Sequence, residues 1–165
     1  MKKVMNLKSL LFCAMLVLTM SLNTVNAQAG ALDYLGHTID GSELTNEMES
    51  IGNYQSVARS TYLHQGFVRI TNNGGGYVGI GAGTECNVTC GTVKLNVYLE
   101  RSSGSEDFYS YKKWENVDYN RSSLYLNQQV KVEKGYYYRL RGYHSCTKNG
   151  VLENGASRTD GIYIG

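Results

Sequence analysis

The chain has 165 residues, including 14 tyrosines and 19 glycines but no proline, and its formal net charge is +2. Three of the lysines lie within the first 27 residues, and the other 138 residues carry 13 basic and 14 acidic side chains, a net charge of −1. A chain of this size suits a single domain with one core. The charge balance argues against nucleic acid as a partner, because recognition of nucleic acid needs a basic surface on the domain itself.

Residues 1–27 have the pattern of an export signal. Lys2, Lys3 and Lys8 precede a largely apolar run at 10–22, which is followed by the small-x-small tripeptide at 25–27. This order predicts a secretory signal peptide cleaved after Ala27. The apolar run is shorter than the roughly 20 residues that span a bilayer, and no second apolar run follows. We therefore expect a secreted, extracellular protein with no membrane anchor.

Residues 28–65 show no sustained hydrophobic period. Residues 28–58 contain five acidic side chains and no lysine or arginine, whereas residues 59–165 carry a net charge of +4. Polar, acidic sequence punctuated by glycine is typical of weakly structured segments. We predict an acidic, loosely structured N-terminal arm over 28–65 and a folded domain over 66–165.

From residue 66 onward apolar side chains alternate with polar ones, which is the pattern of β-strands. About seven short strands are expected, at 67–70, 77–83, 92–100, 107–117, 122–132, 134–146 and 159–165. Their inward faces are predicted to carry Val78, Ile80, Ala82, Val93, Leu95, Val97, Leu99, Leu124, Leu126, Val130 and Val132. No amphipathic helix separates the strands, although a parallel sheet would need helical crossovers, so an antiparallel arrangement is favoured. The pattern predicts an all-β, antiparallel sandwich of the immunoglobulin or fibronectin type, with a small barrel as the alternative.

Several phrases of this sequence resemble a family of small exported proteins of Gram-positive bacteria that is catalogued as a domain of unknown function. The phrases are DGSELTNEMES, RSTYLHQGFVRI, GTVKLNVYLER, KGYYYRLRGYHS and the closing TDGI. The resemblance implies export and a β-sandwich. It implies no activity and no catalytic residues, because none are established for that family.

The strand at 134–146 is expected to present two different faces. The face with Leu140 also carries Tyr136, Tyr138, His144 and Cys146, and should lie toward the core. Tyr136 or Tyr138 is then expected to bond backbone upstream, as the tyrosine corner of a sandwich does. His144 is interpreted as a core histidine rather than a metal ligand or a catalytic base.

The opposite face of this strand is the candidate ligand-binding surface, with Tyr137, Arg139, Arg141 and Tyr143. Tyrosine and arginine are enriched at binding hot spots, because they bury a large area at modest entropic cost. The proposed ligand is a cell-wall glycan or a surface protein, with the acidic arm as an internal alternative. The competing interpretation is a solubilising face in which each arginine lies over a tyrosine ring.

Three cysteines, Cys86, Cys90 and Cys146, follow the predicted signal peptide. In an exported protein an odd number predicts one disulfide and one remaining thiol. The alternation places all three inward, which favours a bridge between Cys146 and Cys90, with Cys86 as the alternative partner. No metal site is expected, because thiols outside the cell tend to oxidise.

No sequence motif for catalysis is present. The chain contains no G-x-S-x-G, H-E-x-x-H, P-loop or dinucleotide-binding fingerprint. We expect no enzymatic activity and no cofactor. The sequence favours a secreted, non-enzymatic binding module, with a bacteriocin-like or toxin-like effector as the alternative.

Overall fold

The computed structural model describes residues 43–55, 60–104 and 107–165, which form strands and no helix. The strands are β1 (Leu44–Thr45), β2 (Glu49–Gln55), β3 (Leu63–Gly74), β4 (Tyr77–Ser102), β5 (Tyr109–Lys131), β6 (Tyr136–Lys148), β7 (Val151–Arg158) and β8 (Gly161–Ile164). The predicted all-β class is confirmed. In these ranges no helix is long and apolar enough to cross a membrane. The predicted signal peptide and residues 28–42 of the predicted arm lie outside the described residues.

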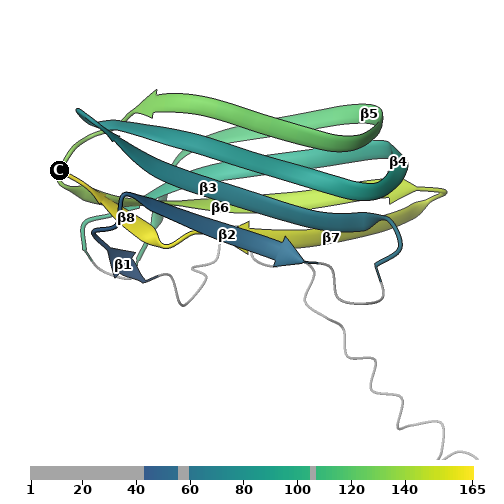
Figure 1. The fold of residues 1–165 in the computed structure, drawn as a ribbon, viewed down its shortest axis with the longest axis horizontal. Coiled ribbons are helices and arrows are strands. Elements are labelled where there is room, and N and C mark those ends of the chain that lie inside the picture. Colours follow the sequence, from purple (N-terminus) through teal and green to yellow (C-terminus); the bar gives the residue numbers. More distant parts are fainter. Residues whose placement is uncertain (1–42, 56–59, 105–106) are drawn as a thin grey trace, which may run out of the picture.

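All eight strands belong to one sheet with the order β1-β8-β6-β4-β3-β2, in which β5 also pairs with β4 and β7 with β6. The strand pairs are antiparallel except β1 with β8. The predicted sandwich of two separate sheets is therefore not what these strands form. The single sheet curls over its own inner face into an open half-barrel (Figure 1), which is consistent with the barrel alternative.

Two long strands explain why one sheet takes the place of two. β4 has 26 residues and β5 has 23, where the sequence predicted pairs of shorter strands. The pairing register of β4 with β5 shifts between Glu85 and Cys90, and the hairpin bends back on itself at one end of the molecule (Figure 1). Extra residues on one strand bend a sheet without ending it. The first half of β4 consequently pairs with β3, and its second half with β6.

The core lies inside the curl and follows the predicted alternation. The predicted inward residues of β4 are all nearly or fully buried, as are Leu126 and Val130, whereas Leu124 is only partly buried. Tyr138 donates a hydrogen bond from its hydroxyl to the Glu133 carbonyl oxygen at 2.9 Å. The predicted upstream tyrosine bond is thus confirmed at Tyr138.

The described part of the predicted arm is more ordered than the sequence suggested. β2 lies within 28–65 and pairs with β3 at seven positions, from Glu49↔Thr71 to Gln55↔Gln65. Its glycine and tyrosine pack against β7, where a Cβ added at Gly52 would overlap the Arg158 carbonyl oxygen and Tyr54 covers Gly155. β2 shows no clear hydrophobic period because backbone contact, rather than apolar side chains, holds it there.

Candidate ligand-binding groove

The arginines of the predicted ligand-binding surface on β6 are buried rather than exposed. Arg139 and Arg141 do lie on the face opposite Leu140, but they are only 2% and 7% exposed. The guanidinium carbon of Arg139 lies 4.0 Å from the centre of the Phe108 ring, and Phe108 in turn packs against Gly161 of β8. The predicted outward surface is therefore not exposed at these arginines, and Phe108, which precedes β5, covers Arg139.

A buried carboxylate explains why these arginines are here. Glu100 of β4 pairs in register with Arg139, and its Oε2 lies 2.8 Å from Arg139 Nε. The other oxygen, Oε1, lies 2.9 Å from Arg141 Nη2. Arg141 also stacks over the Tyr98 ring at 5.1 Å. A carboxylate bonded to two guanidinium groups satisfies charges that would be costly to bury alone. The cluster is therefore part of the folded structure.

The two tyrosines of the predicted surface differ in exposure and in their surroundings. Tyr143 is 7% exposed, whereas Tyr137 is half-buried and its ring centre lies 5.1 Å from that of Tyr163 on β8. The structure places the four predicted residues on one face of β6, but it does not bring them together as an open surface.

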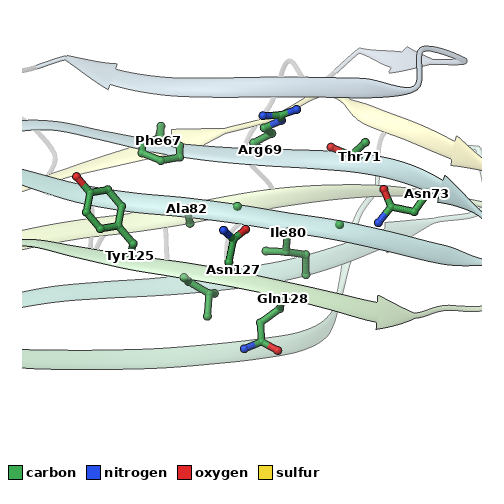
Figure 2. A pocket seen from close by; sticks show the side chains of 12 residues that line it. Phe67, Arg69, Thr71, Asn73, Ile80, Ala82, Tyr125, Asn127 and Gln128 are labelled. Carbon is green, nitrogen blue, oxygen red and sulfur yellow. The ribbon is translucent and has the colours of Figure 1, made fainter.

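An open groove lies elsewhere, on the outer face of β3, β4 and β5 (Figure 2). Its volume is about 530 Å³. Phe67, Arg69, Thr71 and Asn73 follow one another along the β3 side, and Tyr125 and Asn127 face them from β5. These positions alternate with the core residues of the same strands, so the groove is built directly by the period of two.

Two glycines line the floor of the groove. Gly79, Gly81 and Gly83 occupy every second position of β4, on the face opposite Val78 and Ile80. Gly79 and Gly81 line the groove, whereas the rings of Phe67 and Tyr125 cover Gly83. None of the three has a positive φ, so the backbone does not require glycine there. Their effect is spatial: without side chains on the central strand, the flanking strands form two raised edges. Glycine within a strand often marks a site that a ligand approaches closely.

The aromatic end of the groove is held in place by a carboxylate. Phe67 and Tyr125 lie with ring centres 6.4 Å apart at an angle of 44°, over the position of Gly83. The Tyr125 hydroxyl donates to Glu85 Oε1 at 2.8 Å, and this bond raises the pKa of Tyr125. Glu85 also accepts a hydrogen bond from Gln65 at 2.6 Å. The Tyr125 ring is thus oriented before any ligand arrives, although its side chain is 58% exposed.

The polar end of the groove is held in a similar way, and among the described residues it carries no unpaired cation. Arg69 Nε donates to Glu49 Oε2 at 2.7 Å, and the same oxygen accepts from the Thr71 hydroxyl at 3.2 Å. Asn73 and Asn127 are exposed and present amide donors and acceptors toward the floor. The groove combines two aromatic rings, three amide side chains and an arginine that is paired with a carboxylate.

The predicted histidine and cysteine positions are largely confirmed. His144 is fully buried, with Nδ1 at 2.9 Å from the Thr84 hydroxyl and Nε2 at 2.7 Å from the Ser157 hydroxyl. Burial lowers the pKa of His144 to about 4. Cys146 lies beside both Cys90 and Cys86, as predicted, but all three are free thiols and the expected disulfide is absent from this structure.

Most of the groove was not predicted from the sequence, because the alternation was used only to assign the inward residues of β4, such as Val78, Ile80 and Ala82. The signal that could have revealed the groove is the opposite face of the same strand, with glycine at 79, 81 and 83. Glycines at every second position of a strand predict a flat or hollow sheet face, provided that the neighbouring strands carry larger side chains.

Comparison with known proteins identifies a family, but that family has no known function. No curated protein matches the chain. One family does match, and it covers residues 35–161, which include all eight strands except the last three residues of β8. The chain thus belongs to DUF6147, a family of unknown function.

Proposed function

We propose that this protein is an exported, non-enzymatic binding module that holds an uncharged glycan in the groove of β3, β4 and β5. The observation that carries the proposal is the glycine floor, which lets a flat ligand approach the sheet backbone between the rings of Phe67 and Tyr125 and the amide of Asn127. Sugar rings have an apolar face that packs on aromatic rings and a rim of hydroxyl groups that hydrogen-bond to amides.

Charge supports a neutral ligand over a polyanion. Arg69 is the cation among the lining residues, and its guanidinium is already bonded to Glu49. Glu85 adds a second carboxylate at the aromatic end. An anionic polymer would meet two carboxylates beside one paired arginine, whereas neutral hydroxyl groups would meet the amide donors and acceptors of Asn73 and Asn127. Retention on a glycan is therefore expected to change little with ionic strength.

A pulldown on purified Gram-positive cell wall and on insoluble neutral polysaccharides tests the proposal. The critical variant is Gly81→Val, which raises the floor. A Cβ at Gly81 meets its nearest atoms at 3.8 Å, an ordinary contact, so the variant should keep its fold. We expect its affinity to fall about tenfold or more, equivalent to about 1.4 kcal/mol.

Two tyrosines of β5 provide a matched comparison. Tyr125→Ala removes a ring from the groove and should weaken retention, whereas Tyr119→Ala removes a comparably exposed ring remote from it and should not. Equal retention of the wild type, Gly81→Val and Tyr125→Ala would rule out the groove as the site. Retention that disappears at high salt would point to a charged ligand instead.

A further inference from the structure

The bend of the β4–β5 hairpin brings all three described cysteines together. Cys86 ends the stretch of β4 that pairs with β3, opposite Leu63, and Cys90 begins the stretch after the register shift. Cys146 of β6 pairs with Val93 of β4. Their sulfur atoms lie within 4.8 Å of one another. Residues 60 positions apart in the sequence thus converge on one point.

The three sulfurs are shielded from solvent on one side and accessible to it on the other. Cys90 and Cys146 are 0% and 1% exposed and pack with Leu63 and Val93, which are fully buried. Cys86 is only partly buried and marks the open side. A pair of buried thiols is common in protein cores. Three sulfurs facing one another, with one of them reachable from solvent, form the arrangement of a ligand set.

The distances suit a metal ion bound by thiolates. A zinc–sulfur bond of about 2.3 Å places three sulfur ligands roughly 4 Å apart. The three sulfurs all lie within 4.8 Å of one another, which is compatible with this spacing. Soft thiolate ligands select Cu(I) and Zn(II) over harder cations.

Metal binding requires deprotonated sulfurs. A cation bound here would displace the protons that the three thiols still hold. The Cys90 thiol donates to the Val88 carbonyl oxygen at 3.5 Å, and metal binding would replace this weak contact.

The neighbouring charged groups leave the ligand set as three sulfurs. Glu153 pairs with Cys146 across β6 and β7, but its carboxylate accepts hydrogen bonds from the Ser60 hydroxyl at 2.6 Å and from the backbone NH groups of residues 61–63 at 2.7–2.9 Å. Lys148 donates to the Thr89 carbonyl oxygen at 2.7 Å and holds the bend. The fourth position would face solvent beside Cys86.

We propose that Cys86, Cys90 and Cys146 bind one thiophilic metal ion of the Zn(II) or Cu(I) type through three thiolates, with the fourth coordination position open. This site lies at the bend of the hairpin and is independent of the glycan groove. Binding transfers no electrons: three sulfur–metal bonds form, and the remaining thiol protons pass to water.

The experiment titrates the full chain, kept reduced and carrying Cys13→Ser, with Cd(II), whose thiolate charge-transfer absorption reports sulfur coordination. We expect saturation at one ion per chain, competition by Zn(II), and loss of at least about a hundredfold in affinity for Cys90→Ser or Cys146→Ser. Because these variants could fail to fold, the unsubstituted cysteines are also tested for protection from alkylation by Zn(II). Absence of both the absorption and the protection would overturn the proposal. So would protein, isolated without reductant, in which two of the three cysteines resist alkylation until they are reduced.

Discussion

Glu100 links two strands through charge rather than through apolar packing. Its two carboxylate oxygens bond to Arg139 and Arg141 on the neighbouring strand, and all three side chains are nearly excluded from solvent. A buried charge that loses its partner costs far more than an exposed one, because water cannot replace the partner. The cluster therefore acts on stability, where the sequence had suggested recognition.

Glu100→Gln should destabilise the protein by about 3–5 kcal/mol, because two buried guanidinium groups lose their carboxylate. The exposed pair of Arg69 with Glu49 provides the control, and Glu49→Gln should cost at most about 1 kcal/mol. Urea-induced unfolding of the two variants measures both values. Similar small losses in both would show that the buried cluster contributes no more than a surface pair.

His144 should make stability depend on pH. Its pKa falls from 6.5 to about 4 on folding, so the unfolded chain binds the proton more tightly than the folded protein does. The contribution is complete above pH 6.5 and is lost as the pH falls toward 4. It amounts to about 3 kcal/mol, at about 1.36 kcal/mol for each pKa unit.

Unfolding free energies measured from pH 7 to pH 4 test this expectation. The wild type should lose about 3 kcal/mol more than His144→Gln over that interval. Parallel curves for the wild type and His144→Gln would show that the buried ring does not control the acid response.

At the scale of the strands, glycine serves two opposite purposes. In β2 a glycine allows close packing, because a Cβ at Gly52 would overlap the Arg158 carbonyl oxygen of β7. In β4 a glycine leaves space open, because a Cβ at Gly81 meets nothing closer than 3.8 Å. The first kind lets β2 approach β7 closely, and the second leaves the groove open on the outer face.

Gly52→Ala and Gly81→Ala should consequently change the free energy of unfolding by different amounts, or in opposite directions. The first forces β2 away from β7 and should cost about 1–3 kcal/mol or more. The second fits the strand without strain and should be neutral or stabilise the protein by about 0.5 kcal/mol, because glycine is unfavourable in strands. Thermal unfolding of both variants measures the difference. Equal melting temperatures would contradict the close approach of β2 and β7.

The strand pattern of the domain could be predicted from the sequence, but its connections could not. Alternation correctly identified the inward residues of β4 and the core position of His144. It also divided β4 and β5 into separate strands, since the polar residues around the bend resemble a loop. Whether a polar stretch ends a strand or bends it depends on pairing with a distant strand, which local sequence does not specify.

Exposure was the other property that the sequence could not supply. Arg139 and Arg141 were assigned to the correct face of β6, but the covering Phe108 comes from a segment 31 residues earlier in the chain. The groove could not be predicted for the opposite reason, because its main feature is the absence of side chains on β4. Period-two analysis assigns faces to residues, and tertiary packing alone decides which face meets solvent.

At the scale of the whole molecule, the two candidate sites lie in different parts of one curled sheet. The groove occupies the outer face near the middle of β3, whereas the three thiols lie at the bend of β4. The single strand β4 runs through both sites. Loss of metal binding should leave glycan binding intact in the folded protein, and Gly81→Val should leave metal binding intact.

The most direct measurement of the central proposal is an NMR titration of the protein with a soluble oligosaccharide from whichever glycan retains it. We predict chemical-shift changes at the Gly81 backbone amide and the Asn127 side-chain amide, with none along β6 and β7. These changes should be absent in Gly81→Val. Changes confined to other strands, or no change at saturating oligosaccharide, would contradict the assignment of the groove as the binding site.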